Sequence, residues 1–139
     1  TKKMALKYLE HIGIAVKSLQ ISDPLFEALI GCPPYKRESV VSENVITSFF
    51  QSGETKVELL EATSPESAIA KFIEKRGEGI HHIAFAVDDI KAEMQRLQQS
   101  GFTLLNSEPK KGADNKLVCF LHPKSTNGVL VELCQEIKS

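Results

Sequence analysis

The sequence His11-Ile-Gly-Ile-Ala-Val16 recurs later in the chain as His82-Ile-Ala-Phe-Ala-Val87. A second short sequence, Val57-Glu58-Leu59-Leu60, likewise recurs as Val131-Glu132-Leu133-Cys134. The two histidines are 71 residues apart and the two glutamates 74. Within each half, the glutamate follows the histidine by 47 and then by 50 residues. The chain is therefore predicted to contain two copies of one short module, each with one histidine and one glutamate in a strand-like run.

Each copy carries the same pair of potential ligands for a metal ion. An imidazole and a carboxylate from each copy, converging on one point, make a good site for a divalent first-row metal. Because the module is duplicated, we expect such a site to have pseudo-twofold symmetry. The repeat therefore connects an expected fold directly to an expected chemistry.

Length and composition are those of one ordinary globular domain. The chain has 139 residues, of which 42% are apolar and 25% charged, so it can fill a core of its own. Its net charge of -1 gives no general attraction to nucleic acid or to an anionic membrane surface. No apolar run approaches the roughly 20 residues needed to span a bilayer, and no targeting segment is visible.

The three cysteines, Cys32, Cys119 and Cys134, indicate a reducing environment. Their number is odd, they show no C-x-x-C spacing, and two of them lie in apolar strand-like runs. This pattern favours free thiols over a disulfide framework. We therefore expect a cytoplasmic protein.

The first copy is predicted to have one strand, one helix and then three strands. Residues 8–16 alternate and are rich in β-branched residues, and a helix is expected over residues 18–30 with Gly31 as its left-handed stop. Pro24 fits only the first turn of a helix, with Asp23 as the candidate N-cap. The three strands are predicted over residues 35–41, 45–51 and 56–62, with a tight turn at 52–54.

A linker helix follows, and the second copy then repeats the order of the first. The linker helix is expected to start at Thr63 or Ser64 and to end at about Arg76. The second copy is predicted to contain a strand over 80–87, a helix over 88–100, and strands over 102–106, 116–121 and 128–135, with a loop over 108–115. A single domain over residues 1–139 thus contains module 1 at about 7–62, the linker helix at about 63–79 and module 2 at about 80–135.

Strand alternation places each histidine on a face of small residues. The residues that share these faces are Gly13 and Ala15 for His11, and Ala84 and Ala86 for His82. Small side chains leave room for a ligand. The two glutamates, in contrast, are flanked by large apolar residues that point to the opposite face. A buried carboxylate without a partner is costly, so a cation is its natural partner.

These sequences resemble the vicinal oxygen chelate superfamily, also called the glyoxalase superfamily, and most closely its methylmalonyl-CoA epimerase family. The matching stretches are His11-Ile-Gly-Ile-Ala-Val16, Thr55-Lys-Val-Glu-Leu-Leu60, Gly79-Ile-His-His-Ile-Ala84, Phe120-Leu-His-Pro-Lys124 and Gly128-Val-Leu-Val-Glu-Leu133. The resemblance extends over roughly Tyr8 to Leu133. It implies an α+β fold in which two βαβββ modules form a curved mixed sheet, shaped as a cup around a metal site.

The resemblance also implies a reaction and the residues that perform it. The reaction is epimerisation at C2 of methylmalonyl-CoA, by metal-assisted proton abstraction and reprotonation through an enolate. The implied metal ligands are His11, Glu58, His82 and Glu132, and some family members have Gln in place of Glu58. The implied catalytic residues are Glu43 and Glu132, and Glu38 and Glu54 are the alternatives to Glu43.

The resemblance implies a homodimer. It also implies a divalent metal ion as cofactor, most often cobalt, with manganese, nickel, zinc or magnesium as alternatives. Removing the weakly acidic C2 proton requires a Lewis acid at the thioester carbonyl to stabilise the enolate. Inversion then requires one base on each face of the planar enolate. Two carboxylates serve if their acidities are tuned towards the working pH.

Other functions fit parts of the pattern. A glyoxalase I-type lactoylglutathione lyase has the same fold and related ligands, but the segment 120–124 and Glu43 favour the epimerase. A ring-cleaving dioxygenase uses two histidines and one glutamate, which leaves Glu58 without a role. A non-enzymatic small-molecule-binding protein of the superfamily typically lacks the metal ligands.

Four further residues near the repeated sequences are expected to have no role at a metal. His81 faces away from His82 by alternation, which favours a structural or rim position. His122 precedes Pro123 at a strand end and is expected in a turn or at a substrate edge. Glu61 and Glu136 lie at strand ends and are expected to be solvated.

Overall fold

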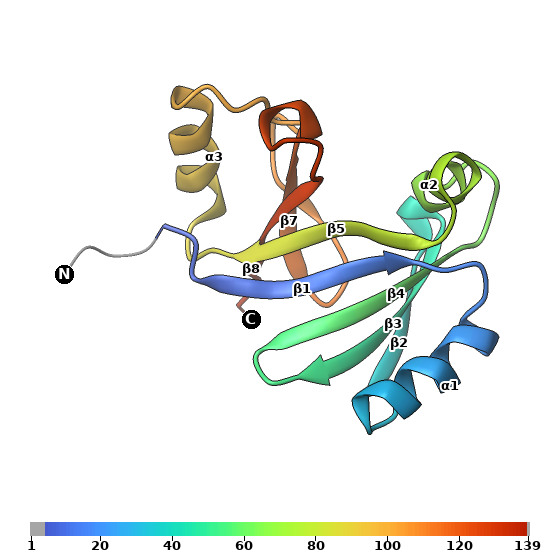
Figure 1. The fold of residues 1–139 in the computed structure, drawn as a ribbon. Coiled ribbons are helices and arrows are strands. Elements are labelled where there is room, and N and C mark those ends of the chain that lie inside the picture. Colours follow the sequence, from blue (N-terminus) through green and yellow to red (C-terminus); the bar gives the residue numbers. More distant parts are fainter. Residues whose placement is uncertain (1–4, 139) are drawn as a thin grey trace. The chain divides into compact units, whose positions relative to one another are not determined.

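The computed structural model of the chain describes residues 5–138, which form two compact units. The first unit comprises His11–His81. The second unit comprises residues 5–10 together with residues 82–138. Figure 1 shows the order of helices and strands along the chain. Each unit contains most of one copy of the repeated module.

The sheet of the first unit has four strands. They are β1 (Tyr8–Ala15), whose residues up to Glu10 belong to the second unit, β2 (Lys36–Val40), β3 (Val45–Ser52) and β4 (Thr55–Ala62). In the order β2-β3-β4-β1, β3 is antiparallel to both of its neighbours, and β1 is parallel to β4. The four strands predicted for this copy are confirmed to within one residue at each end.

Helix α1 (Leu19–Ile30) follows β1, as predicted. The hydroxyl of Ser18 caps its N-terminus, and Gly31, with φ of 95°, ends it in the left-handed conformation that glycine adopts without strain. The expectation that Pro24 lies in the first turn is wrong. Because Ser18 already caps the chain, the helix starts earlier and Pro24 lies inside it.

Helix α2 (Ala68–Arg76) starts later than predicted. The N-cap is Ser67, not Thr63 or Ser64. The reason is that the Thr63 N–H donates to the carbonyl of Asn44, 2.9 Å away, which holds this residue at the end of the β2–β3 hairpin. The chain must then turn before a helix can begin, and Ser67 caps the helix after this turn.

The second unit repeats the arrangement of the first. Its elements are β5 (Gly79–Ala86, which begins in the first unit), α3 (Ile90–Gln99), β6 (Lys110–Lys111), β7 (Lys116–Leu121) and β8 (Val131–Glu136). In the order β5-β8-β7-β6, β8 is parallel to β5, and β7 is antiparallel to β8 and β6. The α+β class and the repeated βαβββ order are therefore confirmed.

One predicted strand of the second copy does not form. Residues 102–106 make only an isolated bridge, between Leu104 and Leu121 of β7. In a regular ladder the Phe120 N–H would donate to a carbonyl of the neighbouring strand. It donates instead to Asn106 Oδ1, 2.9 Å away. A side chain thus replaces a backbone partner and interrupts the ladder. The two-residue β6 is the edge strand of this copy instead.

Apolar side chains from the helices pack against the sheet within each unit. In the first unit, α1 packs Leu19 with Val16, Phe50 and Leu59, whereas α2 packs Ile69 with Ala15 and Leu60 on the other face of the sheet. In the second unit, α3 packs Ile90, Met94 and Leu97 with Cys119 and Leu133. Full burial of a large apolar side chain stabilises the fold by about 1.5–3 kcal/mol. These clusters hold in place the strands that carry the predicted site residues.

All three cysteines are free, as predicted. Cys32 is exposed, and Cys119 and Cys134 are buried. Within residues 5–138, no helix is long and apolar enough to cross a membrane.

Candidate metal centre

Each unit holds one buried histidine–glutamate pair. In the first unit, His11 on β1 and Glu58 on β4 are each 5% exposed, and His11 Nδ1 lies 3.2 Å from Glu58 Oε2. In the second unit, His82 on β5 and Glu132 on β8 are each 6% exposed, and His82 Nε2 lies 3.0 Å from Glu132 Oε1. The fold therefore brings together, within each copy, the two residues that the repeat singled out.

The parallel strand pairs explain this geometry. Glu58 is in register with Gly13 across the β1–β4 pair, and Glu132 is in register with Ala84 across the β5–β8 pair. In both copies the residue beside the glutamate is the small one that follows the histidine by two positions. A small neighbour leaves the carboxylate free to lean along the strand towards the histidine, which is on the same face.

The donors within each pair suit a divalent first-row metal ion. Imidazole nitrogen and carboxylate oxygen are the ligands that such ions take in proteins. A carboxylate that is about 95% buried loses most of its hydration, and a bound cation would offset that loss. Both units thus offer a histidine–glutamate group able to bind a metal, with a buried negative charge that a cation would neutralise.

The three candidates for the second catalytic base lie on different parts of the first unit. Glu43 ends the short 3-10 helix Val41–Glu43, between β2 and β3, and is exposed. Glu54 is exposed in the tight turn between β3 and β4. Glu38, on β2, is half-buried, and its Oε1 lies 3.5 Å from Lys36 Nζ.

The remaining histidines have contacts that fit the roles expected of them. His81 packs edge-on against Phe72 of α2, with ring centroids 5.1 Å apart. The Nδ1 atom of His122 accepts a hydrogen bond from the Lys124 N–H, 3.0 Å away, at the start of the turn Pro123–Ser125. His81 is therefore a packing residue, and His122 caps a turn.

Glu61 is not a solvated residue, contrary to expectation. Its Oε1 atom accepts a hydrogen bond from the N–H of Leu19, the first residue of α1, at 2.6 Å. The second copy has the same contact, because Gln135 Oε1 accepts from the N–H of Ile90, the first residue of α3, at 2.7 Å. In each copy the residue three positions after the buried glutamate thus satisfies an unpaired amide of the helix.

Two phenylalanines near the glutamates were not given a role by the sequence analysis. Phe49 on β3 is directly opposite Glu58, and Phe120 on β7 is directly opposite Glu132. The Phe120 ring also lies 5.7 Å from the His82 ring, at an interplanar angle of 83°. The signal is an aromatic residue 9 or 12 positions before each glutamate, and it has a meaning only once the hairpin registers are known.

Cys119 is not a reactive thiol. Burial raises the pKa of its thiol, the charge of Glu132 adds to the rise, and a hydrogen bond from Asn106 opposes it. The thiol therefore stays protonated near neutral pH, and a protonated thiol is a poor metal ligand and nucleophile.

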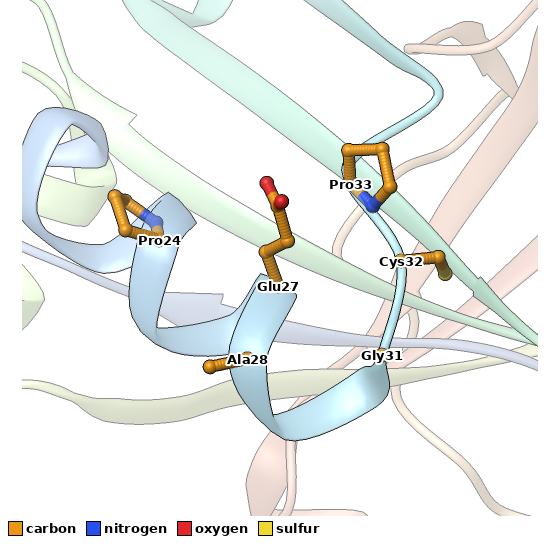
Figure 2. A pocket seen from close by; sticks show the side chains of 6 residues that line it. All are labelled: Pro24, Glu27, Ala28, Gly31, Cys32 and Pro33. Carbon is orange, nitrogen blue, oxygen red and sulfur yellow. The ribbon is translucent and has the colours of Figure 1, made fainter.

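A surface hollow at the end of α1 is separate from the buried histidine–glutamate pair of the same unit. It is lined by Pro24, Glu27, Ala28, Gly31, Cys32 and Pro33 (Figure 2). Helix α1 packs on the sheet face that carries Leu59, whereas the neighbouring Glu58 points to the opposite face. The hollow thus lies on the helix side of the sheet, away from the face that carries Glu58.

The chain is similar to known proteins over most of its length. The profile of the Glyoxalase/Bleomycin resistance protein/Dioxygenase superfamily matches residues 10–120. An ethylmalonyl-CoA/methylmalonyl-CoA epimerase of Cereibacter sphaeroides is 41% identical, with 91% of this chain and 96% of that protein covered. The mitochondrial methylmalonyl-CoA epimerase of Homo sapiens is 38% identical, with 91% of this chain and 73% of that protein covered.

Solved structures agree with these sequence matches. A variant of Streptomyces coelicolor methylmalonyl-CoA epimerase, in complex with 2-nitronate-propionyl-CoA, superposes with a TM-score of 0.89 at 32% identity. The comparison covers 96% of this chain and 99% of that chain.

Proposed function

We propose that this chain is a metal-dependent epimerase acting at C2 of methylmalonyl-CoA. The chain belongs to the Glyoxalase/Bleomycin resistance protein/Dioxygenase superfamily. The observation that carries the proposal is the buried histidine–glutamate pair that recurs in both copies, at 3.2 and 3.0 Å. The relatives that match across most of the chain and are named methylmalonyl-CoA epimerases support the choice of substrate.

We propose further that His11, Glu58, His82 and Glu132 together bind one divalent metal ion, with cobalt as the first choice. These two nitrogens and two oxygens would hold the ion, and a malonyl thioester offers its carboxylate and carbonyl oxygens as further ligands. The bound ion would supply the Lewis acid that stabilises the negative charge developing on the thioester oxygen.

The proton is moved by this chain's own carboxylates. Glu132 and Glu43 are the proposed bases, one on each face of the planar enolate. One carboxylate takes the C2 proton of one epimer, and the other delivers a proton to the opposite face, so that the net change is inversion at C2. After inversion the two carboxylates have exchanged protonation states, which suits the opposite epimer, and proton exchange with solvent restores the starting states for another turnover in the same direction.

Metal analysis combined with two assays tests this function. The purified protein should contain about one divalent ion per chain, should epimerise methylmalonyl-CoA, and should lose this activity on chelation and regain it when cobalt is added. Turnover of the methylglyoxal–glutathione hemithioacetal without epimerisation would make the protein a glyoxalase I-type lyase. No metal and no turnover of either substrate would indicate a binding protein.

A homodimer formed through the outer face of α1 is also part of the proposal. This face exposes Ile21, Leu25 and Leu29 at 75%, 65% and 74%, spaced so that they form one apolar stripe. Pro24 and Ala28, which line the hollow in Figure 2, lie on the same helix. An exposed apolar stripe of this kind suits a twofold contact with a second copy, which would bury it.

Sedimentation of matched variants tests the dimer. The wild-type protein should sediment at twice 15.4 kDa, and Leu25→Lys should reduce this to 15.4 kDa. Gln95→Lys, on the exposed side of α3, adds the same charge to the equivalent helix and should leave the dimer intact. A monomeric wild type, or a dimeric Leu25→Lys variant, would contradict this interface.

The cytoplasm is the proposed location. Support comes from the free thiols of Cys32, Cys119 and Cys134, which favour a reducing compartment.

A further inference from the structure

Phe120, His82 and Glu132 are neighbours on one face of the second unit. Phe120 is directly opposite Glu132 in the β7–β8 register, and its ring lies 5.7 Å from the His82 ring in an edge-on arrangement. His82 in turn lies 3.0 Å from Glu132. The ring therefore borders both the imidazole and the carboxylate of this pair.

The equivalent phenylalanine of the first unit is not available to a ligand. Phe49 is opposite Glu58 but is 0% exposed, with the Tyr35 ring 5.9 Å away and the Lys36 ammonium over its face at 4.8 Å. Phe120, in contrast, is only half-buried. Of the two aromatic rings opposite the glutamates, only the ring of Phe120 keeps apolar surface for a ligand.

We infer that Phe120 determines how large an alkyl substituent the enzyme accepts at C2 of a malonyl thioester. The inference rests on the proposed function, in which Glu132 exchanges the C2 proton. A base must lie within about 3 Å of the atom whose proton it takes. Directly opposite residues in an antiparallel pair have Cβ atoms only about 4.5–5.5 Å apart. A substituent on C2 beside Glu132 therefore meets the Phe120 ring.

The size of the effect follows from the chemistry of the contact. One methylene group more or less in an apolar pocket typically changes selectivity by about 10–200-fold. Methyl and ethyl substituents differ by one methylene group, so Phe120 should discriminate between methylmalonyl-CoA and ethylmalonyl-CoA. A relative named as an epimerase of both substrates shows that the larger substituent is compatible with this type of enzyme.

The test compares kcat/KM for methylmalonyl-CoA and ethylmalonyl-CoA in the metal-loaded enzyme. Phe120→Leu should lower the methyl-to-ethyl selectivity at least tenfold, mainly through a gain with the ethyl substrate, and Phe120→Trp should raise it. Phe85→Leu is the matched control, because Phe85 on β5 packs against the α3 cluster on the other face of the same sheet. This control loses a ring and some thermal stability but should keep the wild-type selectivity.

The possible outcomes separate this inference from the proposed function. Unchanged selectivity in both Phe120 variants, with wild-type metal content and an active wild type, overturns the inference and leaves the proposed function standing. The same holds if Phe85→Leu changes the selectivity as much as Phe120→Leu does. A wild type that epimerises neither substrate overturns the proposed function, and this inference with it. If Phe120→Leu does not fold, Phe120→Trp decides the question by its opposite direction.

Discussion

The two copies of the module agree where the strands are parallel and differ where they are antiparallel. In both parallel pairs, β1–β4 and β5–β8, a histidine, a small residue and a glutamate occupy equivalent positions. On the antiparallel side, Phe49 is covered by Tyr35 and Lys36, whereas Phe120 stays half-buried beside His82. The helices differ as well, because α1 exposes an apolar stripe and α3 exposes lysine and glutamine.

This difference separates two requirements on the sequence. A metal ligand set must keep its donor atoms within a few tenths of an ångström, and the parallel pair fixes them through strand register. Substrate selectivity and self-association require only a surface of suitable shape, which can differ between the copies. The two histidine–glutamate pairs therefore recur in both copies, and we propose that substrate recognition and dimer formation do not.

The largest expected effect comes from breaking the symmetry of the two buried glutamates. Glu132 is proposed as both ligand and base, and Glu58 as ligand only. Glu132→Gln should thus lower kcat about 10⁴-fold, at the upper end for loss of a general base. Glu58→Gln keeps an oxygen ligand and should retain metal, so kcat should fall by no more than the about 10–100-fold that is typical of changes around metal ligands. Equal loss of activity in both variants would show that the two glutamates do the same work.

The next effect concerns the second base, for which the two copies give no matching pair. Glu43→Gln should lower kcat about 10²–10⁴-fold while metal content is unchanged. Glu132 would still exchange the C2 proton of one epimer, so deuterium from D₂O should enter that epimer faster than the epimers interconvert. Glu38→Gln, on the neighbouring strand, is the matched control and should keep nearly wild-type kcat. The reverse result would identify the half-buried Glu38 as the base.

Metal-dependent stability tests whether both copies contribute to one centre. A metal at 100 times its Kd should stabilise the fold by about 2.7 kcal/mol, measured as a rise in Tm on adding cobalt to the metal-free protein. His11→Ala and His82→Ala should each abolish this rise, because one ion needs ligands from both copies. His81→Ala is the control, since His81 packs on Phe72 and should leave the rise intact. If one of the two ligand variants keeps the full rise, the centre belongs to a single copy.

Much of the fold could be predicted because the sequence pattern of each strand and helix occurs in both copies of the module. The strands that carry the repeated sequences, the helix stop at Gly31 and the two histidine–glutamate pairs all follow from local patterns. Two of the errors arose where a distant contact overrides a local signal. The side chain of Asn106 accepts a hydrogen bond from the Phe120 N–H and interrupts a predicted strand. The hydrogen bond from Thr63 to Asn44 moves the start of α2 to a later residue.

The roles of Phe120 and Glu61 could not be predicted for a different reason. Phe120 lies opposite Glu132 only because a turn of particular length joins β7 to β8, and a turn length cannot be read from alternation. Glu61 looked like a solvated strand end, since the amide that it binds belongs to Leu19, 42 residues away. Contacts that depend on tertiary register leave no periodic signal in the sequence.

The smallest predicted effect uses the contact that Glu61 and Gln135 share. Each accepts a hydrogen bond from the first amide of a helix, at 2.6 and 2.7 Å, so the two copies show that a glutamate and a glutamine both satisfy this position. Glu61→Ala and Gln135→Ala leave a helix amide without a partner and should each cost about 1–3 kcal/mol in the free energy of unfolding. The exchanges Glu61→Gln and Gln135→Glu preserve the acceptor and should cost less than about 1 kcal/mol in the free energy of unfolding. Only Glu61→Gln should lower this free energy, because an ionised acceptor binds an amide near a helix N-terminus more strongly. Urea denaturation of the metal-free protein gives these four values without interference from metal binding. If the exchanges cost as much as the alanine variants, the hydrogen bond is not what these side chains contribute, and the likeness of the two copies at this position is one of shape alone.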